Sequence, residues 1–262
     1  MRRPSTIVCA VVLAVIALAV IVPQLLAPHS PLAIDPASAF SPPSIAHPLG
    51  TDESGRDTLT RIVHGARASI GVGCAATAIG IGIGLVIGFA AGLGPRVLDA
   101  ALARVTEVLY SLPTLVMALL FVAISGASRT SSILAIGLAT APGYARMLRS
   151  RIRQVAHSDY VAYARLEGVS GPRRLVRHIV PNTLWPLVAA ATLGIGQAVV
   201  WVAALSFLGL GTPPPSPEWG AMLNAGRVYI QNAWWLTVFP GLAIVVTATA
   251  LTAIGRRVGR IS

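Results

Sequence analysis

Residues 68–94 read ASIGVGCAATAIGIGIGLVIGFAAGLG, a stretch that contains no charged side chain. A helix needs about 20 mostly apolar residues to cross a hydrocarbon layer about 30 Å thick, so this stretch predicts a membrane-spanning helix. Gly80, Gly84, Gly88 and Gly92 recur at every fourth position, on one face of that helix. Because small residues let helices approach closely, we expect this face to pack against a neighbouring helix rather than to form a dedicated dimer seam.

The rest of the chain has the same apolar character. Hydrophobic residues make up 55% of it, charged residues only 11%, and the mean hydropathy is +0.74, which excludes an ordinary soluble domain. Lipid cannot satisfy open backbone groups, so the predicted fold is an all-α polytopic membrane protein. Pro113 and Pro142 are expected to kink the third and fourth of its helices. The six predicted transmembrane helices cover residues 7–26, 68–94, 104–125, 131–148, 184–210 and 236–254.

The arginines indicate the orientation of these helices. With the N-terminus inside, five arginines fall outside and fifteen fall on the cytoplasmic side, as the positive-inside rule requires, and both termini are then cytoplasmic. The net charge of +11 is therefore assigned to topology and to contact with anionic lipid, and not to nucleic acid. The cytoplasmic set is Arg2, Arg3, Arg96, Arg104, the eight arginines from Arg146 to Arg177, Arg256, Arg257 and Arg260; the outer set is Arg56, Arg61, Arg67, Arg129 and Arg227.

These patterns divide the chain into three parts. Residues 1–28 hold the first helix, and no clear small-x-small cleavage site follows it, so it is expected to remain as an anchor rather than to be removed as a signal peptide. Residues 29–67 form an outside loop and an interfacial segment. Residues 68–262 form a five-helix core that contains a cytoplasmic loop at 149–183.

Nothing in the sequence predicts a catalytic, cofactor-binding or metal-binding residue. The five histidines are scattered, and Cys9 and Cys74 lie inside apolar stretches. The chain has no lysine, so it cannot contain the phosphate-binding loop G-x-x-x-x-G-K-[ST]. Glu107 is the one acid inside a predicted span; Arg104 is three residues away, which favours an ion pair near the interface over a proton-relay site.

A charged segment separates the fourth and fifth predicted spans. Residues 159–182 read DYVAYARLEGVSGPRRLVRHIVPN. Ser158 can cap a first short helix that ends at Gly168, and a second short helix is expected at 173–179, with Pro181 at the entry to the fifth span. Ala164 and Gly168 lie four residues apart, so we expect them to leave a shallow surface on which a partner could pack.

Two outer loops carry further patterns. Residues 49–70 read LGTDESGRDTLTRIVHGARASI, and an ion-paired loop that becomes an interfacial helix is predicted there. Residues 211–235 read GTPPPSPEWGAMLNAGRVYIQNAWW. Their aromatic residues (Trp219, Tyr229, Trp234 and Trp235) are expected at the level of the lipid headgroups.

These blocks resemble one family. Gly168, nine intervening residues, His178 and then Pro181 are similar to the EAA loop of ATP-binding-cassette importer permeases. The flanking residues and both outer-loop blocks resemble the dipeptide/oligopeptide/nickel permeases, most closely the second permease subunit of a dipeptide importer, over residues 45–245. Tyr163 departs from the family pattern, which has two small residues here, and Glu167 adds a charge beside Gly168.

The resemblance implies a type I importer fold, similar to the methionine importer, with cytoplasmic EAA coupling helices. It implies a non-catalytic subunit of the bacterial cytoplasmic membrane that imports di- or oligopeptides, with nickel or haem as alternative cargo. The implied partners are a homologous second permease, two cytoplasmic ATPase subunits that bind ATP and Mg, and an external peptide-binding protein. The implied coupling residues are Asp159, Ala164, Gly168, Arg177, His178 and Pro181, and the outer family motif, hereafter the loop motif, is Gly50, Asp52, Gly55, Arg56 and Asp57.

A gradient-driven secondary transporter is the alternative from another class. Such carriers use acids or broken helices within the membrane at their coupling site. Glu107 is the single acid that the predicted spans offer for this role.

Overall fold

The computed structural model describes residues 4–259, and within them the regular secondary structure is helical apart from one isolated bridge between Thr51 and Asp57. Arg2, Arg3 and Arg260, which the charge pattern assigns to the cytoplasmic side, lie outside the described residues. The α-helices are α1 (Pro4–Ile21), α2 (Thr58–Leu93), α3 (Arg96–Ser111), α4 (Thr114–Ser125), α5 (Arg129–Ala156), α6 (Asp159–Leu166), α7 (Gly171–Arg174), α8 (Val180–Leu184), α9 (Leu187–Phe207), α10 (Trp219–Gly226) and α11 (Trp235–Val258). Short 3₁₀ segments lie at Pro23–Leu25, Pro36–Ser38 and Arg227–Tyr229, and a π-helical segment lies at Leu175–Ile179.

Three of the helices are long and apolar enough to cross a membrane, namely α2, α9 and α11. A fourth crossing is counted if α3 and α4 form one span, although their axes meet at 91°. The kink predicted at Pro113 is therefore a complete break between two helices. The apolar part of α1, Val8–Ile21, is shorter, and α5 carries several arginines, so their assignment as spans remains a prediction.

The glycine face of α2 packs against α5, as the four-residue period predicts. A Cβ atom added at Gly84 would lie 2.6 Å from Tyr144 Cβ, and one added at Gly88 would lie 2.8 Å from Leu148 Cβ. Gly80 meets Thr140 and Gly92 meets Ile152 in the same way. Each glycine thus accepts a larger side chain of α5, and this seam holds the two helices in parallel.

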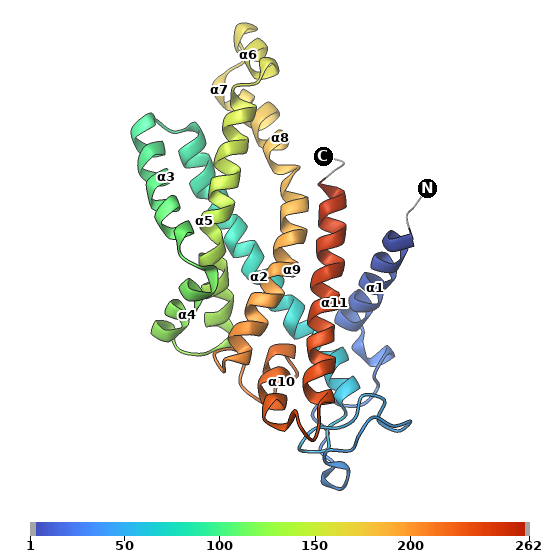
Figure 1. Cartoon of the computed structure of the whole chain (residues 1–262). Helices are drawn as coiled ribbons and strands as arrows, with labels where there is room; N and C mark the ends of the chain where they lie inside the picture. Colours follow the sequence, from blue (N-terminus) through green and yellow to red (C-terminus); the bar gives the residue numbers. More distant parts are fainter. Residues whose placement is uncertain (1–3, 260–262) are drawn as a thin grey trace.

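The elements divide between two ends of the bundle (Figure 1). The segment with α6 and α7 projects at one end, on the same side as the start of α1 and the end of α11. The loop before α2 and helix α10 lie at the opposite end. Buried apolar clusters join α2, α4, α5 and α9 at the centre, α1, α2 and α9–α11 on one side, and α5, α6 and α9 near the projecting end.

Three expected boundaries differ from the structure. The interfacial segment is not separate from the second span, because α2 begins at Thr58 and continues without interruption to Leu93. The loop expected at 149–183 begins later, since α5 extends to Ala156. The second short helix does not end before Pro181: the helical backbone runs from Gly171 to Leu184. Proline cannot donate to the preceding turn, and the π-helical turn at Leu175–Ile179 leads directly into it.

Candidate functional site

The projecting segment, residues 158–186, turns sharply at Gly168. Gly168 has a φ of +78°, a left-handed conformation that favours glycine. Its N–H donates to the Arg165 carbonyl at 3.1 Å, and the Val169 N–H donates to the Ala164 carbonyl at 3.0 Å, which ends α6. Ser158 precedes α6 as predicted, but its hydroxyl donates to the Val155 carbonyl at 2.6 Å and does not cap the helix.

The expected shallow surface shared by Ala164 and Gly168 is not present. Ala164 is only 6% exposed, because it and Val161 face inward on α6, where Val161 packs with Ile152 and Ile179. Gly168 is exposed. A small residue at position 164 thus lets α6 lie close to its own chain, and a partner cannot reach it without displacing α6.

The exposed surface of the segment carries large apolar side chains among its charged ones. Tyr163, Leu166 and Val176 are exposed, Leu166 to 82%. Monomeric proteins seldom leave such large apolar side chains together at a protruding tip unless they contact something else. This surface is the strongest indication of a partner at this end of the molecule.

The remaining predicted residues of the segment are placed around this tip. Asp159, Arg177 and Pro181 are exposed. His178 is half-buried, and its ring lies 6.4 Å from that of Tyr160 on α6. The His178 carbonyl accepts a hydrogen bond from the Asn182 amide at 2.7 Å. His178 therefore joins the two short helices of the segment.

At the other end of the molecule, Asp52 organises the loop motif. Its Oδ1 accepts from the N–H groups of Ser54 and Arg56, both at 2.9 Å. Its Oδ2 lies 3.1 Å from Nη1 of Arg61 and 3.5 Å from Nη1 of Arg56. Asp52 and Arg61 are both buried, so the ion pairs predicted in this loop form a polar core and not a solvated surface.

Asp57 connects the same loop to α2. Its Oδ2 accepts from the backbone N–H of Thr60 at 2.8 Å and from the Thr60 hydroxyl at 2.7 Å, which caps the helix. Its Oδ1 lies 3.1 Å from Nδ1 of His47. The carboxylate therefore fixes where α2 begins.

The two glycines of the loop motif allow close backbone contacts. Gly50 and Gly55 have φ values of +72° and +73°. A Cβ atom at Gly50 would lie 2.6 Å from Nε1 of Trp235, and one at Gly55 would overlap the carbonyl of Asp35. The Trp235 indole donates to the carbonyl of Thr51 at 3.0 Å, so the loop is attached to the start of α11.

Helix α10 closes this end. Glu218 is 1% exposed, and its two carboxylate oxygens accept from the N–H groups of Gly220 and Ala221 at 2.8 and 2.9 Å. The Trp219 N–H donates to Ser69 Oγ, and its indole donates to the Ile62 carbonyl at 2.9 Å. The expected headgroup position is therefore wrong for the buried Trp219 and also for the buried Trp235, which are structural hydrogen-bond donors.

One polar cluster was not identified from the sequence. Asp99 on α3 is 6% exposed and accepts from Nε of Arg149 at 2.5 Å and from Nη2 of Arg153 at 2.6 Å, both on α5. The four-residue spacing of the two arginines on one helix face was the available signal. The predicted pair of Arg104 and Glu107 is present at 3.4 Å, but both side chains are largely exposed.

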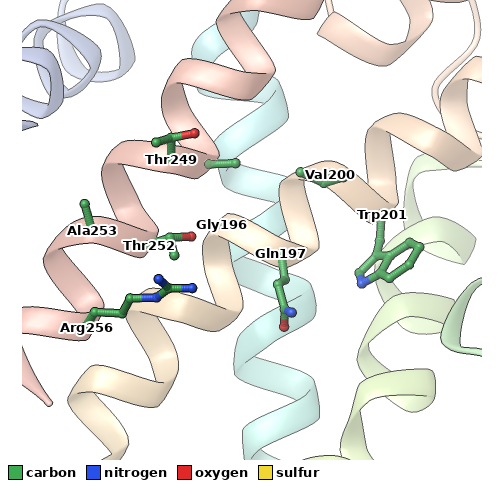
Figure 2. Close-up of a pocket in the computed structure, with 9 residues that line it drawn as sticks. Gly196, Gln197, Val200, Trp201, Thr249, Thr252, Ala253 and Arg256 are labelled. Carbon is green, nitrogen blue, oxygen red and sulfur yellow. The ribbon is translucent and has the colours of Figure 1, made fainter.

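Two cavities open on either side of α9. One, of about 600 Å³, lies among α2, α5, α9 and the break between α3 and α4. The other, of about 550 Å³, lies between α9 and α11, where Arg256 extends from α11 toward α9 (Figure 2). Gln197 and Trp201 of α9 line both cavities.

Comparison with known proteins gives a consistent result. Residues 82–261 match the family described as "Binding-protein-dependent transport system inner membrane component". The chain is 39% identical over 253 residues to the probable D,D-dipeptide transport system permease protein of Escherichia coli, covering 96% of this chain and 85% of that one. It is 38% identical over 207 residues to the di/tripeptide transport system permease protein of Pseudomonas aeruginosa, covering 79% and 68%. The dipeptide transport system permease protein of Escherichia coli is 36% identical over 260 residues, covering 97% and 87%.

Solved structures share the fold. An inward-facing structure of the MetNI methionine ABC transporter superposes with a TM-score of 0.63 at 18% identity, covering 77% of this chain and 95% of that one. An amino acid ABC transporter with histidines gives a TM-score of 0.60 at 15% identity, covering 77% and 94%. The predicted similarity to the methionine importer is confirmed at the level of the fold.

Proposed function

Because the chain belongs to the family of inner membrane components of binding-protein-dependent transport systems, we propose that it is the permease subunit of an ATP-driven importer of di- or oligopeptides. The observation that carries this proposal is the identity of 36–39%, extending over most of the chain, to relatives whose names specify peptide transport. The alternative cargoes, nickel and haem, gain no support from these three relatives.

The energy for transport enters through other chains in this proposal. Two cytoplasmic ATPase subunits, which bind ATP and Mg, dock at the projecting segment. Its exposed Tyr163, Leu166 and Val176 supply apolar contact area, and the exposed Arg177 supplies charge at the same tip. Movement of this segment would reach the bundle through α5 and α9, to which it is directly connected.

The opposite end faces the exterior. There the loop motif, α10 and the start of α11 form one hydrogen-bonded unit. This unit is the surface on which an external peptide-binding protein docks. Both termini and the projecting segment would then be cytoplasmic. The start of α1, the end of α11 and the projecting segment lie at the same end of the bundle (Figure 1). A homologous second permease completes the membrane-embedded part of the importer. This chain contributes six membrane-spanning segments, of which α1 and α5 are two.

The test is uptake by a defined complex. The chain, its partner permease and two ATPase subunits are reconstituted in vesicles with ATP inside, and radiolabelled dipeptide is added outside with the binding protein. We expect uptake that requires both ATP and the binding protein. Uptake by the chain without ATPase subunits, driven by an ion gradient alone, would instead establish a secondary carrier and contradict the proposal.

A further inference from the structure

The larger cavity beside α9 has an uncharged lining. Its volume of about 600 Å³ falls in the range of roughly 300–1,000 Å³ that is usual for small-molecule sites. Among the described residues its polar side chains are hydroxyl, amide and indole groups: Thr77, Tyr110, Ser111, Thr114, Thr140, Tyr144, Gln197 and Trp201. The guanidinium of Arg146 lies over the Tyr110 ring, 5.1 Å from its centre, but Arg146 does not line the cavity.

Several of these polar groups have no hydrogen-bond partner within residues 4–259. The side chains of Gln197, Tyr144 and Trp201 form no hydrogen bond there, and the Thr77 hydroxyl is buried without one. An amide or hydroxyl that faces hydrocarbon unpaired costs several kcal/mol. Gln197 is exposed at the middle of α9. This face of α9 therefore requires water, a polar ligand or polar groups of the second permease against it, and not acyl chains.

The backbone at the edge of the cavity leads to the same conclusion. Ser111, Leu112 and Pro113 line the cavity where α3 and α4 meet at 91°. Irregular backbone at membrane depth is tolerated where it is covered by protein or where it lines a water-filled space. All three residues are exposed in this chain, so this backbone must face water or the second permease proposed above, and not lipid.

The open face of α9 extends beyond this cavity. Gln197 and Trp201 also border the space between α9 and α11, shown in Figure 2 with Thr249 and Thr252 on the other wall. Gln197 and Trp201 thus lie between the two cavities, about halfway along α9. On the α11 side the lining includes one charged group, Arg256, so the uncharged lining is a property of the larger cavity.

We propose that the Gln197 face of α9 and the cavity beside it are this chain's wall of the peptide pathway, and that the wall does not select peptides by side-chain charge. The proposal rests on the function proposed above. A zwitterionic peptide can exchange hydrogen bonds with amide and hydroxyl groups as it passes, and a wall without ionised groups neither retains nor repels a charged side chain.

The decisive variants introduce a charge at Gln197. Uptake of Ala-Ala, Ala-Glu and Ala-Lys is compared in the reconstituted complex, with one binding protein that accepts all three. We expect Gln197→Glu to lower Ala-Glu uptake relative to Ala-Lys by about tenfold, and Gln197→Lys to have the opposite effect by a similar factor. Gln231→Glu and Gln231→Lys, at an exposed glutamine in the outer loop, serve as matched controls and should leave the ratios unchanged.

A second measurement does not depend on transport, so it remains informative if the Gln197 variants lose all activity. In a chain without Cys9 and Cys74, Gln197→Cys should react with a membrane-impermeant maleimide in the assembled complex, whereas Val15→Cys on the apolar face of α1 should not. Equal effects of the Gln197 variants on all three peptides, or no reaction at Gln197→Cys, would overturn the proposal while wild-type uptake persists. Absence of ATP-driven uptake by the wild type would instead reject the proposed function.

Discussion

At the scale of single residues, the most consequential positions are glycines and buried carboxylates. Gly168, Gly50 and Gly55 each hold a left-handed backbone conformation that shapes a loop at one end or the other. Asp52, Asp99 and Glu218 are buried acids, and each is satisfied by arginines, by backbone N–H groups or by both. In each case the residue type follows from a local geometric or electrostatic requirement.

Gly168 offers a direct test of the projecting segment. We expect Gly168→Arg to leave membrane insertion intact but to lower dipeptide uptake per ATP hydrolysed at least fivefold. A left-handed conformation costs a residue with a side chain about 1–2 kcal/mol, so the turn after α6 would be reshaped. The measurement is uptake and ATPase activity in the same vesicles.

Gly171→Arg is the matched control for this change. Gly171 is also exposed, and an added Cβ there meets nothing within 4 Å, but its φ is not positive. It receives the same charge and size without backbone strain. If both variants uncoupled transport equally, the left-handed turn at Gly168 would not be the cause.

At the scale of elements, the contact between α2 and α5 determines the packing of the bundle. The glycines of α2 at 80, 84, 88 and 92 accept successive side chains of α5. The sequence predicted this face correctly because a four-residue glycine period is a local pattern. It could not identify α5 as the partner, since that depends on which helices the connections bring together.

This seam predicts opposite results for two neighbouring glycines. Gly84→Ala should destabilise the protein by about 1–3 kcal/mol, because the new Cβ would lie 2.6 Å from Tyr144 Cβ and 3.0 Å from a backbone nitrogen. Gly82→Ala, where nothing lies within 4 Å, should be neutral or slightly stabilising. Thermal unfolding in detergent measures both, and equal melting temperatures would argue against the seam.

A second prediction concerns the attachment of α3 to α5. Asp99→Asn should destabilise the protein by about 1–2 kcal/mol, because the partly buried Arg149 and the exposed Arg153 lose their common counter-charge. Glu107→Gln on the same helix removes an exposed pair and should change stability by less than about 1 kcal/mol. Unfolding curves of the two variants provide the comparison, and a loss at Glu107→Gln as large as that at Asp99→Asn would show that burial is not what matters.

At the scale of the whole molecule, the loop before α2 and helix α10 lie at one end of the bundle and the projecting segment lies at the other (Figure 1). The proposed orientation can be tested by labelling. In intact cells, Ser44→Cys should react with an impermeant maleimide from outside, and Ser170→Cys should react only after the membrane is opened. Labelling of Ser170→Cys in intact cells would reverse the orientation and remove the basis for ATPase docking.

The sequence predicted the helical fold and the location of the projecting segment, because apolar length and glycine or proline breaks are local signals. It did not predict that Ala164 is buried, that Trp219 and Trp235 are internal donors, or that Asp99 binds two arginines. Each of these depends on contacts between residues far apart in the chain. The cavity beside Gln197 was missed for the same reason, since three separate helices and the break between α3 and α4 form it.

The regular spacing of the α2–α5 seam has a mechanical consequence. Because both rows repeat every four residues, a translation of α5 by about 6 Å along its axis would bring Thr140 opposite Gly84, Tyr144 opposite Gly88 and Leu148 opposite Gly92. The seam thus has two registers in which a bulky side chain faces a glycine. A pull on α5 toward the tip would therefore be transmitted along the bundle as a discrete step, without the two helices separating.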